Sequence, residues 1–178
     1  AGLNHNLVLK SDGSLVSWGG GPVTNVPAGL PNVVAIAAGN LHSVAVTGDG
    51  VLREWGTYSG GWSMNTPTNF GPIKALSCGH AHTVALRPDG SISVWGDDAT
   101  GETNIPPEAT GIVAIVSGGH HVLALRADGK IIAWGSNQYN ETNVPPGLSN
   151  VVRLAAGQAH SLALQADGTL VSWGYPLV

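Results

Sequence analysis

The chain has 178 residues, of which 10% are charged, with 26 Gly, 11 Pro and a formal net charge of -4. Its 7 Lys and Arg residues are too few for the basic face that a nucleic-acid binder needs, so this composition excludes polyanion binding. A single cysteine, Cys78, excludes an intramolecular disulfide and a Cys-rich zinc site. No apolar run approaches the roughly 18 residues that cross a bilayer.

The first predicted unit is a cassette that begins at Gly2 and ends at Gly19. It reads Gly-x-x-His, a short apolar stretch, Asp-Gly, a second apolar stretch and Trp-Gly. The cassette occurs 5 times, and in every copy the opening Gly and the Trp are 16 positions apart. Successive Trp residues lie 37, 40, 39 and 39 positions apart, so the length varies only in the connecting joints. Rigid units with variable joints are typical of a repeat fold.

Each cassette predicts a β-hairpin, because Asp-Gly between two apolar runs is typical of a two-residue type I′ turn. A further apolar run precedes each later cassette and predicts a third strand, at residues 33–37, 73–76, 112–116 and 151–155. The Pro-ending stretches 24–27, 103–106 and 142–145 predict a short fourth strand at the sheet edge, where Pro is tolerated.

Three or four short strands in each repeat of about 39 residues predict an all-β fold, a β-propeller built of tandem repeats. Residues 1–178 form a single propeller segment. Its predicted repeats are approximately 1–19 (partial), 20–56, 57–96, 97–135 and 136–174.

The repeated pattern resembles that of the regulator of chromosome condensation family over essentially the whole chain. The pattern reads Ala-Ala-Gly-x-x-His-Ser-x-Ala-Leu, then Asp-Gly, then Trp-Gly-x-Asn. The Glu-Thr-Asn-Val-Pro segment after Trp-Gly is closer in style to bacterial members, one of which is a secreted propeller that inhibits β-lactamases. The resemblance implies a propeller, usually of seven blades, that is used for protein contacts. It also implies a bacterial protein that is secreted or lies at the cell surface.

The segment is incomplete relative to a seven-bladed ring. Seven blades of this repeat need on the order of 270 residues. Three alternatives follow: a fragment, a half that closes with a second copy through open strand edges, or an unusually small propeller. Unpaired strand edges invite pairing with another chain, so self-association belongs among the predicted contacts.

The recurring His and Trp residues are predicted to be framework. Zinc needs ligand nitrogens at about 2.0–2.1 Å, and one histidine from each blade does not converge that closely, so we predict no metal site and no cofactor. Each histidine is instead expected to hydrogen-bond to backbone within or between blades, while His80 and His120 lie outside the repeated position and are expected at the surface. The large indole rings are expected to pack between blades. These framework positions are His5, His42, His82, His121 and His160, with Trp18, Trp55, Trp95, Trp134 and Trp173.

Catalysis is not predicted, and no catalytic residue is assigned. Pairs such as His42-Ser43 lie side by side on a strand, so their side chains point to opposite faces and neither serves as base for the other. Cys78 takes the position of Ala38, Ser117 and Ala156 in the other repeats, where a small residue is needed for packing.

The variable joints after Trp-Gly hold the predicted partner-binding residues. One joint carries aromatic residues and a methionine, which are typical interface anchors, and the other two carry acidic and aromatic residues that suit a basic protein surface. These residues are Tyr58, Trp62, Met64, Phe70, Asp97, Asp98, Glu102, Tyr139 and Glu141. The predicted function is a protein–protein interaction scaffold. The alternatives are a carbohydrate-binding, lectin-like propeller and a structural repeat segment of a larger bacterial surface or secreted protein.

Overall fold

The computed structural model describes residues 1–56, 66–67 and 70–175. Within these residues the chain forms antiparallel β-sheets, and its only helical element is a 3₁₀ turn, η1 (Pro22–Thr24). No helix in this part of the chain has the length and apolar character needed to cross a membrane. The all-β prediction is confirmed.

Five small sheets follow one another along the chain as blades. Blade 1 has β1 (His5–Leu9) and β2 (Leu15–Gly19), and blade 2 has β3 (Val33–Ala38), β4 (His42–Thr47) and β5 (Leu52–Gly56). Blade 3 has β6 (Ala75–Cys78), β7 (His82–Leu86) and β8 (Ile92–Gly96). Blade 4 has β9 (Ile112–Ser117), β10 (His121–Arg126) and β11 (Ile131–Gly135), and blade 5 has β12 (Val151–Ala156), β13 (His160–Gln165) and β14 (Leu170–Gly174).

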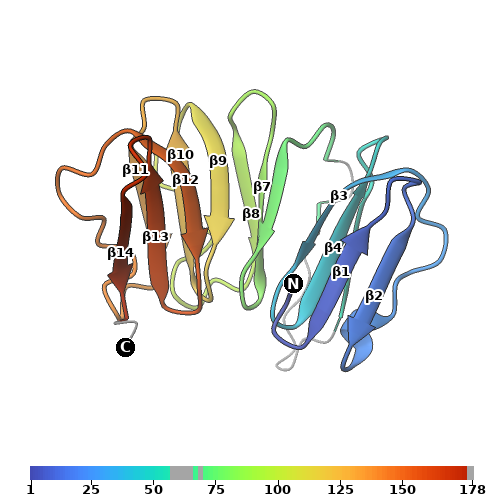
Figure 1. The fold of residues 1–178 in the computed structure, drawn as a ribbon. Helices are drawn as coiled ribbons and strands as arrows, with labels where there is room; N and C mark the ends of the chain where they lie inside the picture. The colour runs from blue at the N-terminus through green and yellow to red at the C-terminus, as the bar shows by residue number, and fades with distance from the viewer. Residues whose placement is uncertain (57–65, 68–69, 176–178) are drawn as a thin grey trace.

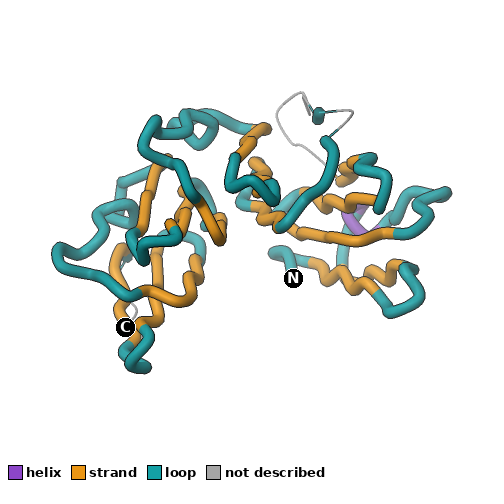
Figure 2. Tube along the Cα trace, turned by 90° about the horizontal axis from the view of Figure 1, so that it is seen from above, coloured by secondary structure: helices purple, strands orange, loops and turns teal. Residues whose placement is uncertain are grey.

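The blades stand side by side in an arc, with β1–β2 at one end and β12–β14 at the other (Figures 1 and 2). In every three-stranded blade the middle strand pairs with both neighbours. The first strands β3, β6, β9 and β12 also contact one another from blade to blade, so they lie innermost. This arrangement is that of a propeller, as the repeats predict.

Two local predictions are wrong. The predicted fourth strand is absent from the described residues, because the backbone of these stretches turns back on itself: the N–H of Ile105 bonds to the carbonyl of Thr103, and the N–H of Val144 to that of Thr142.

The hairpin turns are also not type I′. Each Gly has a positive φ, for example 80° at Gly13, but the Asp before it does not. The Gly13 N–H bonds to the Lys10 carbonyl, and the Lys10 N–H bonds to the Ser14 carbonyl. This is a type I turn that ends in a glycine bulge, and it spares the Asp a strained left-handed conformation.

The core lies between the blades. The tryptophan of each inner blade packs against the preceding blade: Trp95 joins Val44 and Val46, and Trp134 joins Val84 and Leu86. Trp55, Trp95 and Trp134 are 5–7% exposed, which confirms their predicted packing role. Burial of a ring of this size is a large part of the stabilisation of a blade pair.

The outward faces of the first and last blades are exposed. On blade 1 they present Val8, Val16 and Trp18, whose ring is 51% exposed. On blade 5, Leu170 is exposed and the neighbouring Leu162 and Leu164 are half-buried. Leu162 and Leu164 match Val44 and Val46, which are buried between inner blades, and Trp18 matches the buried Trp55. The predicted self-association stays a prediction.

Candidate functional site

The repeated histidines link each blade to the next. In three of the four blade pairs the imidazole Nε2 bonds to a side-chain hydroxyl, and not to backbone as expected from the sequence. The pairs are His5 with Ser43 at 2.7 Å, His42 with Thr83 at 2.9 Å and His121 with Ser161 at 3.0 Å. The opening Gly of the cassette is required because a Cβ there would overlap the same imidazole ring, as at Gly79 beside His82.

The same position is different in the blade 3–4 pair. Val122 stands where blades 2, 3 and 5 have Ser43, Thr83 and Ser161, and no described residue bonds to Nε2 of His82. Burial lowers the pKa of His82 to about 3, and it lowers the pKa of His42 and of His121 to about 4. These rings are therefore neutral at neutral pH and closed off from solvent. They serve as structural links and are poorly placed to act as catalytic bases.

The hydroxyl partners of the histidines are not accessible to solvent, and Cys78, which is half-buried, is a weak nucleophile. Ser43 and Ser161 are fully buried. Burial raises the pKa of the Cys78 thiol far above its ordinary value, which keeps it protonated and weakly nucleophilic.

One face of the molecule gathers the Gly-x-x-His turns and the beginnings of the joints after Trp-Gly. We call it the loop face; the opposite face, with the Asp-Gly turns, is the hairpin face. The two parts of the loop face meet because the cassette His pairs with the Gly after Trp, as His121 does with Gly135. In Figure 1 the loop face is at the bottom, where β14 ends.

A pocket of about 360 Å³ lies where the turns of all five blades converge on the loop face. Its lining is mostly Gly and Ala. The polar side chains in the lining are those of Asn40, Gln158, Ser117 and Cys78. The Asn40 amide donates to His80 Nδ1 at 2.9 Å and to Gln158 Oε1 at 3.4 Å. Side chains from three blades therefore meet here, but the lining holds no charged group.

Two loops on this face, residues 97–102 after β8 and residues 136–141 after β11, have the same backbone hydrogen bonds. In each, the residue at the second position accepts a bond from the backbone N–H five positions later: Thr103 to Asp98 at 2.9 Å and Thr142 to Asn137 at 3.2 Å. The tryptophan of the following blade donates to the loop glutamate carbonyl, at 2.8 Å in both cases.

The loop glutamates are buried, and their carboxylates accept hydrogen bonds from backbone N–H groups of their own loops. Glu102 is 0% exposed and Glu141 is 2% exposed, so they do not form the solvent-facing acidic rim that the sequence suggested. Glu102 Oε2 accepts the Thr100 N–H at 2.8 Å, and Glu141 Oε2 accepts the Tyr139 N–H at 2.6 Å. Burial alone would raise the pKa of Glu141, but hydrogen bonds from the Ser136 hydroxyl and from backbone N–H groups outweigh it and hold the pKa below its ordinary value.

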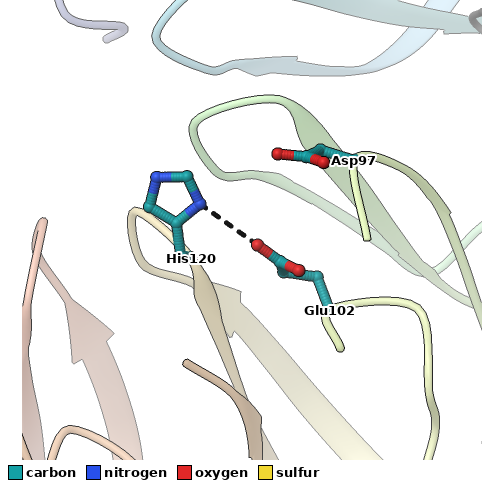
Figure 3. Close-up of side chains that lie close together, drawn as sticks. All are labelled: Asp97, Glu102 and His120. Atoms are coloured by element: carbon teal, nitrogen blue, oxygen red, sulfur yellow. Dashed lines mark hydrogen bonds and ion pairs between the residues drawn. The ribbon is translucent and has the colours of Figure 1, made fainter. Parts of the chain in front are cut away.

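The two loops differ in what faces the second glutamate oxygen. The Ser136 hydroxyl donates to Glu141 Oε1 at 2.6 Å. In the other loop Asp97 takes the place of that serine, and Glu102 Oε1 instead accepts from His120 Nδ1 at 3.1 Å (Figure 3). Asp97 is only 6% exposed, and its Oδ1 accepts the Ala99 N–H at 3.1 Å. One ligand atom from each of Asp97, Glu102 and His120 lies within 4.8 Å of the other two.

His80 connects this cluster with the pocket. Its ring lies 4.9 Å from the His120 ring, at an interplanar angle of 31°. Burial, and then the neighbouring His120, lower the pKa of His80 below its ordinary value. A continuous row of polar groups therefore runs from Gln158 through Asn40 and His80 to His120 and its carboxylate partners.

The remaining predicted contact residues are scattered. Asp98 and Tyr139 are exposed on the loop face, and Tyr139 meets Tyr175 edge-on at 5.0 Å. Phe70 is 4% exposed and packs on Trp95 at 5.4 Å, so it belongs to the core, which corrects its expected place at the surface. Tyr58, Trp62 and Met64 lie outside the described residues.

Sequence reasoning missed His120 and Tyr175. His120 was expected to be an unremarkable surface residue, whereas it bonds to a buried carboxylate. A signal was present: the equivalent positions in the other repeats are Asn4, Leu41, Ala81 and Ala159, so blade 4 alone has an ionisable group there.

Comparison with known proteins agrees with this architecture. Residues 73–102 and 112–141 match the model of the regulator of chromosome condensation (RCC1) repeat. No curated protein sequence matches the chain. Among solved structures, Prp20p from Saccharomyces cerevisiae, described with its binding properties to Gsp1p and histones, is similar with a TM-score of 0.77 and 24% identity. That likeness covers 97% of this chain and 56% of Prp20p.

Two further structures show the same fold. Yeast RCC1 (Prp20) bound to Kap60 gives a TM-score of 0.77 and 23% identity, over 97% of this chain and 54% of that one. The CRINKLY WD40 ectodomain of the Arabidopsis thaliana receptor kinase ACR4 gives 0.76 and 20%, over 99% and 63%. The chain thus spans just over half the length of the yeast proteins. Repeats, blades and structural matches together identify the chain as a β-propeller segment, and two of its repeats match the RCC1 repeat model.

Proposed function

We propose that the chain is a non-catalytic scaffold that binds a protein partner through its loop face. One observation carries this proposal: positions that are alike in the repeats are mostly buried, whereas exposed side chains on the loop face differ between repeats. Asp98 has Asn137 as its counterpart, and Tyr139 has Thr100. Variation on exposed loops above a fixed scaffold is typical of a recognition surface.

The partner that fits this face is a protein with a basic surface. Asp98 contributes negative charge, Tyr139 and Tyr175 contribute exposed rings, and the chain as a whole carries a net charge of -4. Aromatic side chains are enriched in interfaces, and complementary charge favours association. The proteins named with the yeast structures, Gsp1p, histones and Kap60, support protein binding as a use of this fold.

The absence of a catalytic role is part of the same proposal. The framework histidines of blades 1 to 4 are buried, and the pocket on the loop face is lined mainly by Gly and Ala. Such a lining lacks the converging titratable groups that acid–base or nucleophilic chemistry needs. The predicted secreted or cell-surface location stays a prediction.

Site-specific photo-crosslinking tests the proposal. A photo-reactive amino acid replaces Tyr139 on the loop face or, as a matched control, the exposed Thr169 on the hairpin face. Partners captured in a lysate of the source organism are identified by mass spectrometry, purified and titrated with the full chain. We expect adducts at position 139 only.

The purified partner then serves for a quantitative test. Asp98→Asn combined with Tyr139→Ala should weaken its binding by roughly tenfold or more, as expected for an interface anchor. Asp167→Asn on the hairpin face is the control and should leave affinity unchanged. Equal losses in both variants, or adducts at position 169 only, would contradict the proposed surface.

A further inference from the structure

We propose that Asp97, Glu102 and His120 form a binding site for one divalent transition cation of the zinc class. One imidazole nitrogen and two carboxylate oxygens are donors that Zn²⁺ accepts in proteins. Cations such as Mg²⁺ and Ca²⁺ prefer all-oxygen sites with more ligands, so this donor set favours zinc. The set comes from two blades and the joint between them: Asp97 follows β8, Glu102 lies in the joint, and His120 precedes β10.

The geometry needs little change to hold the ion. His120 Nδ1 and Glu102 Oε1 are 3.1 Å apart, and an ion about 2.0–2.2 Å from each fits between them. The ligand atoms of all three residues lie within 4.8 Å of one another, whereas ligands of a tetrahedral zinc are separated by about 3.4 Å. A side-chain rotation of Asp97 or His120 that moves its ligand atom by up to about 1.4 Å closes the set.

The electrostatics of the cluster also favour a cation. The carboxylates of Asp97 and Glu102 lie side by side, and the third member of the cluster is a single imidazole. Asp97 is 6% exposed, and its Oδ1 accepts the Ala99 N–H; no described donor bonds to its Oδ2, which stays within reach of solvent. Two carboxylates this close repel each other, and a bound cation would offset that repulsion and give Asp97 Oδ2 a partner.

The sister loop shows that Asp97 is not needed for the loop fold. Residues 136–141 keep the same hydrogen bonds with Ser136 in that position, and its hydroxyl donates directly to Glu141. Ala159 stands there at the position of His120. Asp97 and His120, which together with Glu102 make the three-donor cluster, thus occur together at the first loop. Both are missing at the second loop.

The framework fixes the donors in place. The Asp97 N–H bonds to the Ala81 carbonyl at 2.8 Å, and the His120 carbonyl accepts the Ser136 N–H at 2.8 Å. Glu102 is held by Thr100 and its carbonyl by Trp134. The His120 side chain is 36% exposed, which leaves a route for the ion and an open position for water. His80 stacks beside this site with Nδ1 engaged by Asn40, so we assign it no ligand role.

Zinc titration of the full chain by isothermal calorimetry tests the site. We expect one Zn²⁺ bound per chain at micromolar or tighter affinity, not displaced by excess Mg²⁺ or Ca²⁺. His120→Ala and Asp97→Asn should each weaken binding by roughly tenfold or more, since even the loss of a supporting group costs that much. Asp98→Asn, an acidic neighbour outside the cluster, is the matched control and should bind as the wild type does. Thermal unfolding of the ion-free variants checks that each one folds.

Co²⁺ provides a second readout, because its visible absorption reports coordination by nitrogen and oxygen ligands. The wild type should give one saturable spectrum, and His120→Ala should lose it. The proposal is overturned if the wild type binds no Zn²⁺, or if folded His120→Ala or Asp97→Asn binds as the wild type does. It is also overturned if His80→Ala abolishes binding while Asp97→Asn does not, since the ion would then belong to the stacked histidine pair.

Discussion

The loop at residues 97–102 and the loop at residues 136–141 have the same backbone and the same buried glutamate, yet their chemistry differs. In the second loop the Ser136 hydroxyl and backbone N–H groups satisfy the Glu141 carboxylate. In the first loop Asp97 replaces the hydroxyl donor with a second carboxylate, and His120 enters from the next blade. A repeat protein can therefore keep a fold constant while two substitutions at matched positions create a candidate site.

The largest expected effect concerns the histidine framework under both loops. The pKa of His82 lies at about 3, and those of His42 and His121 at about 4, below the ordinary value of 6.5. The unfolded chain binds these protons first, so the folded state is fully favoured above pH 6.5 and loses stability as the pH falls toward 4. Each unit of lowered pKa corresponds to about 1.4 kcal/mol, so several such histidines acting together should unfold the propeller in acid.

Denaturant unfolding at a series of pH values checks this prediction. Loss of stability should begin near pH 6.5, well above the ordinary pKa of a carboxyl group, which is 4.5 for glutamate. A free energy of unfolding that stays flat from pH 6.5 down to 4.5 would show that the histidines are not buried as neutral groups.

A smaller effect is expected from the glutamate that both loops share. Glu102→Ala and Glu141→Ala should each lower the free energy of unfolding by about 2–3 kcal/mol, because buried backbone donors lose a charged acceptor. Glu108→Ala, an exposed glutamate in the same joint as Glu102, is the control and should change stability by less than about 0.5 kcal/mol. A loss in one loop without an equal loss in the other would break their structural equivalence.

The hydroxyl partners of the histidines should give effects of opposite sign. Ser161→Ala removes the partner of His121 and should cost about 1–3 kcal/mol. Val122→Thr introduces a hydroxyl of nearly the same shape beside His82 and should stabilise the chain by about 1 kcal/mol. Chemical denaturation measures both, and a destabilised Val122→Thr variant would mean that the His82 ring is not positioned as its sisters are.

The smallest effect on stability is expected at His120. Its side chain is partly exposed, so His120→Ala should change the free energy of unfolding by less than about 1 kcal/mol in the absence of metal. Thermal unfolding with and without Zn²⁺ sharpens the contrast: added Zn²⁺ should raise the melting temperature of the wild type but not that of the variant. A variant that melts far below the wild type without metal would make His120 a framework residue.

The sequence was sufficient to predict the repeated framework because each of its positions has a single structural role within the repeat. The glycine of Gly-x-x-His gives room to a ring, and the tryptophan fills the space between blades. The turn type was predicted wrongly because Asp-Gly occurs both in a type I′ turn and in a type I turn with a glycine bulge, which is one residue longer. The fourth strand was predicted wrongly because the residue pattern does not reveal the backbone turn at Thr103.

The candidate site was only half predictable. Asp97 and Glu102 stand out by type and spacing, but their burial depends on Trp134 and His120 of the next blade. The angle between blades decides which residues meet across a joint, and no local pattern encodes it. Phe70 was misplaced for the same reason: its partner Trp95 is brought to it by the packing of neighbouring blades.

The most direct test of the difference between the two loops is the stability of the double variant Asp97→Ser with His120→Ala, measured by denaturant unfolding without metal. This variant places at positions 97 and 120 the side chains that the second loop has at Ser136 and Ala159. Because the introduced hydroxyl can donate to Glu102 as Ser136 does to Glu141, we expect the variant to be at least as stable as the wild type. A loss of more than about 2 kcal/mol would contradict this, and would show that Asp97 and His120 support the fold instead of forming a site upon it.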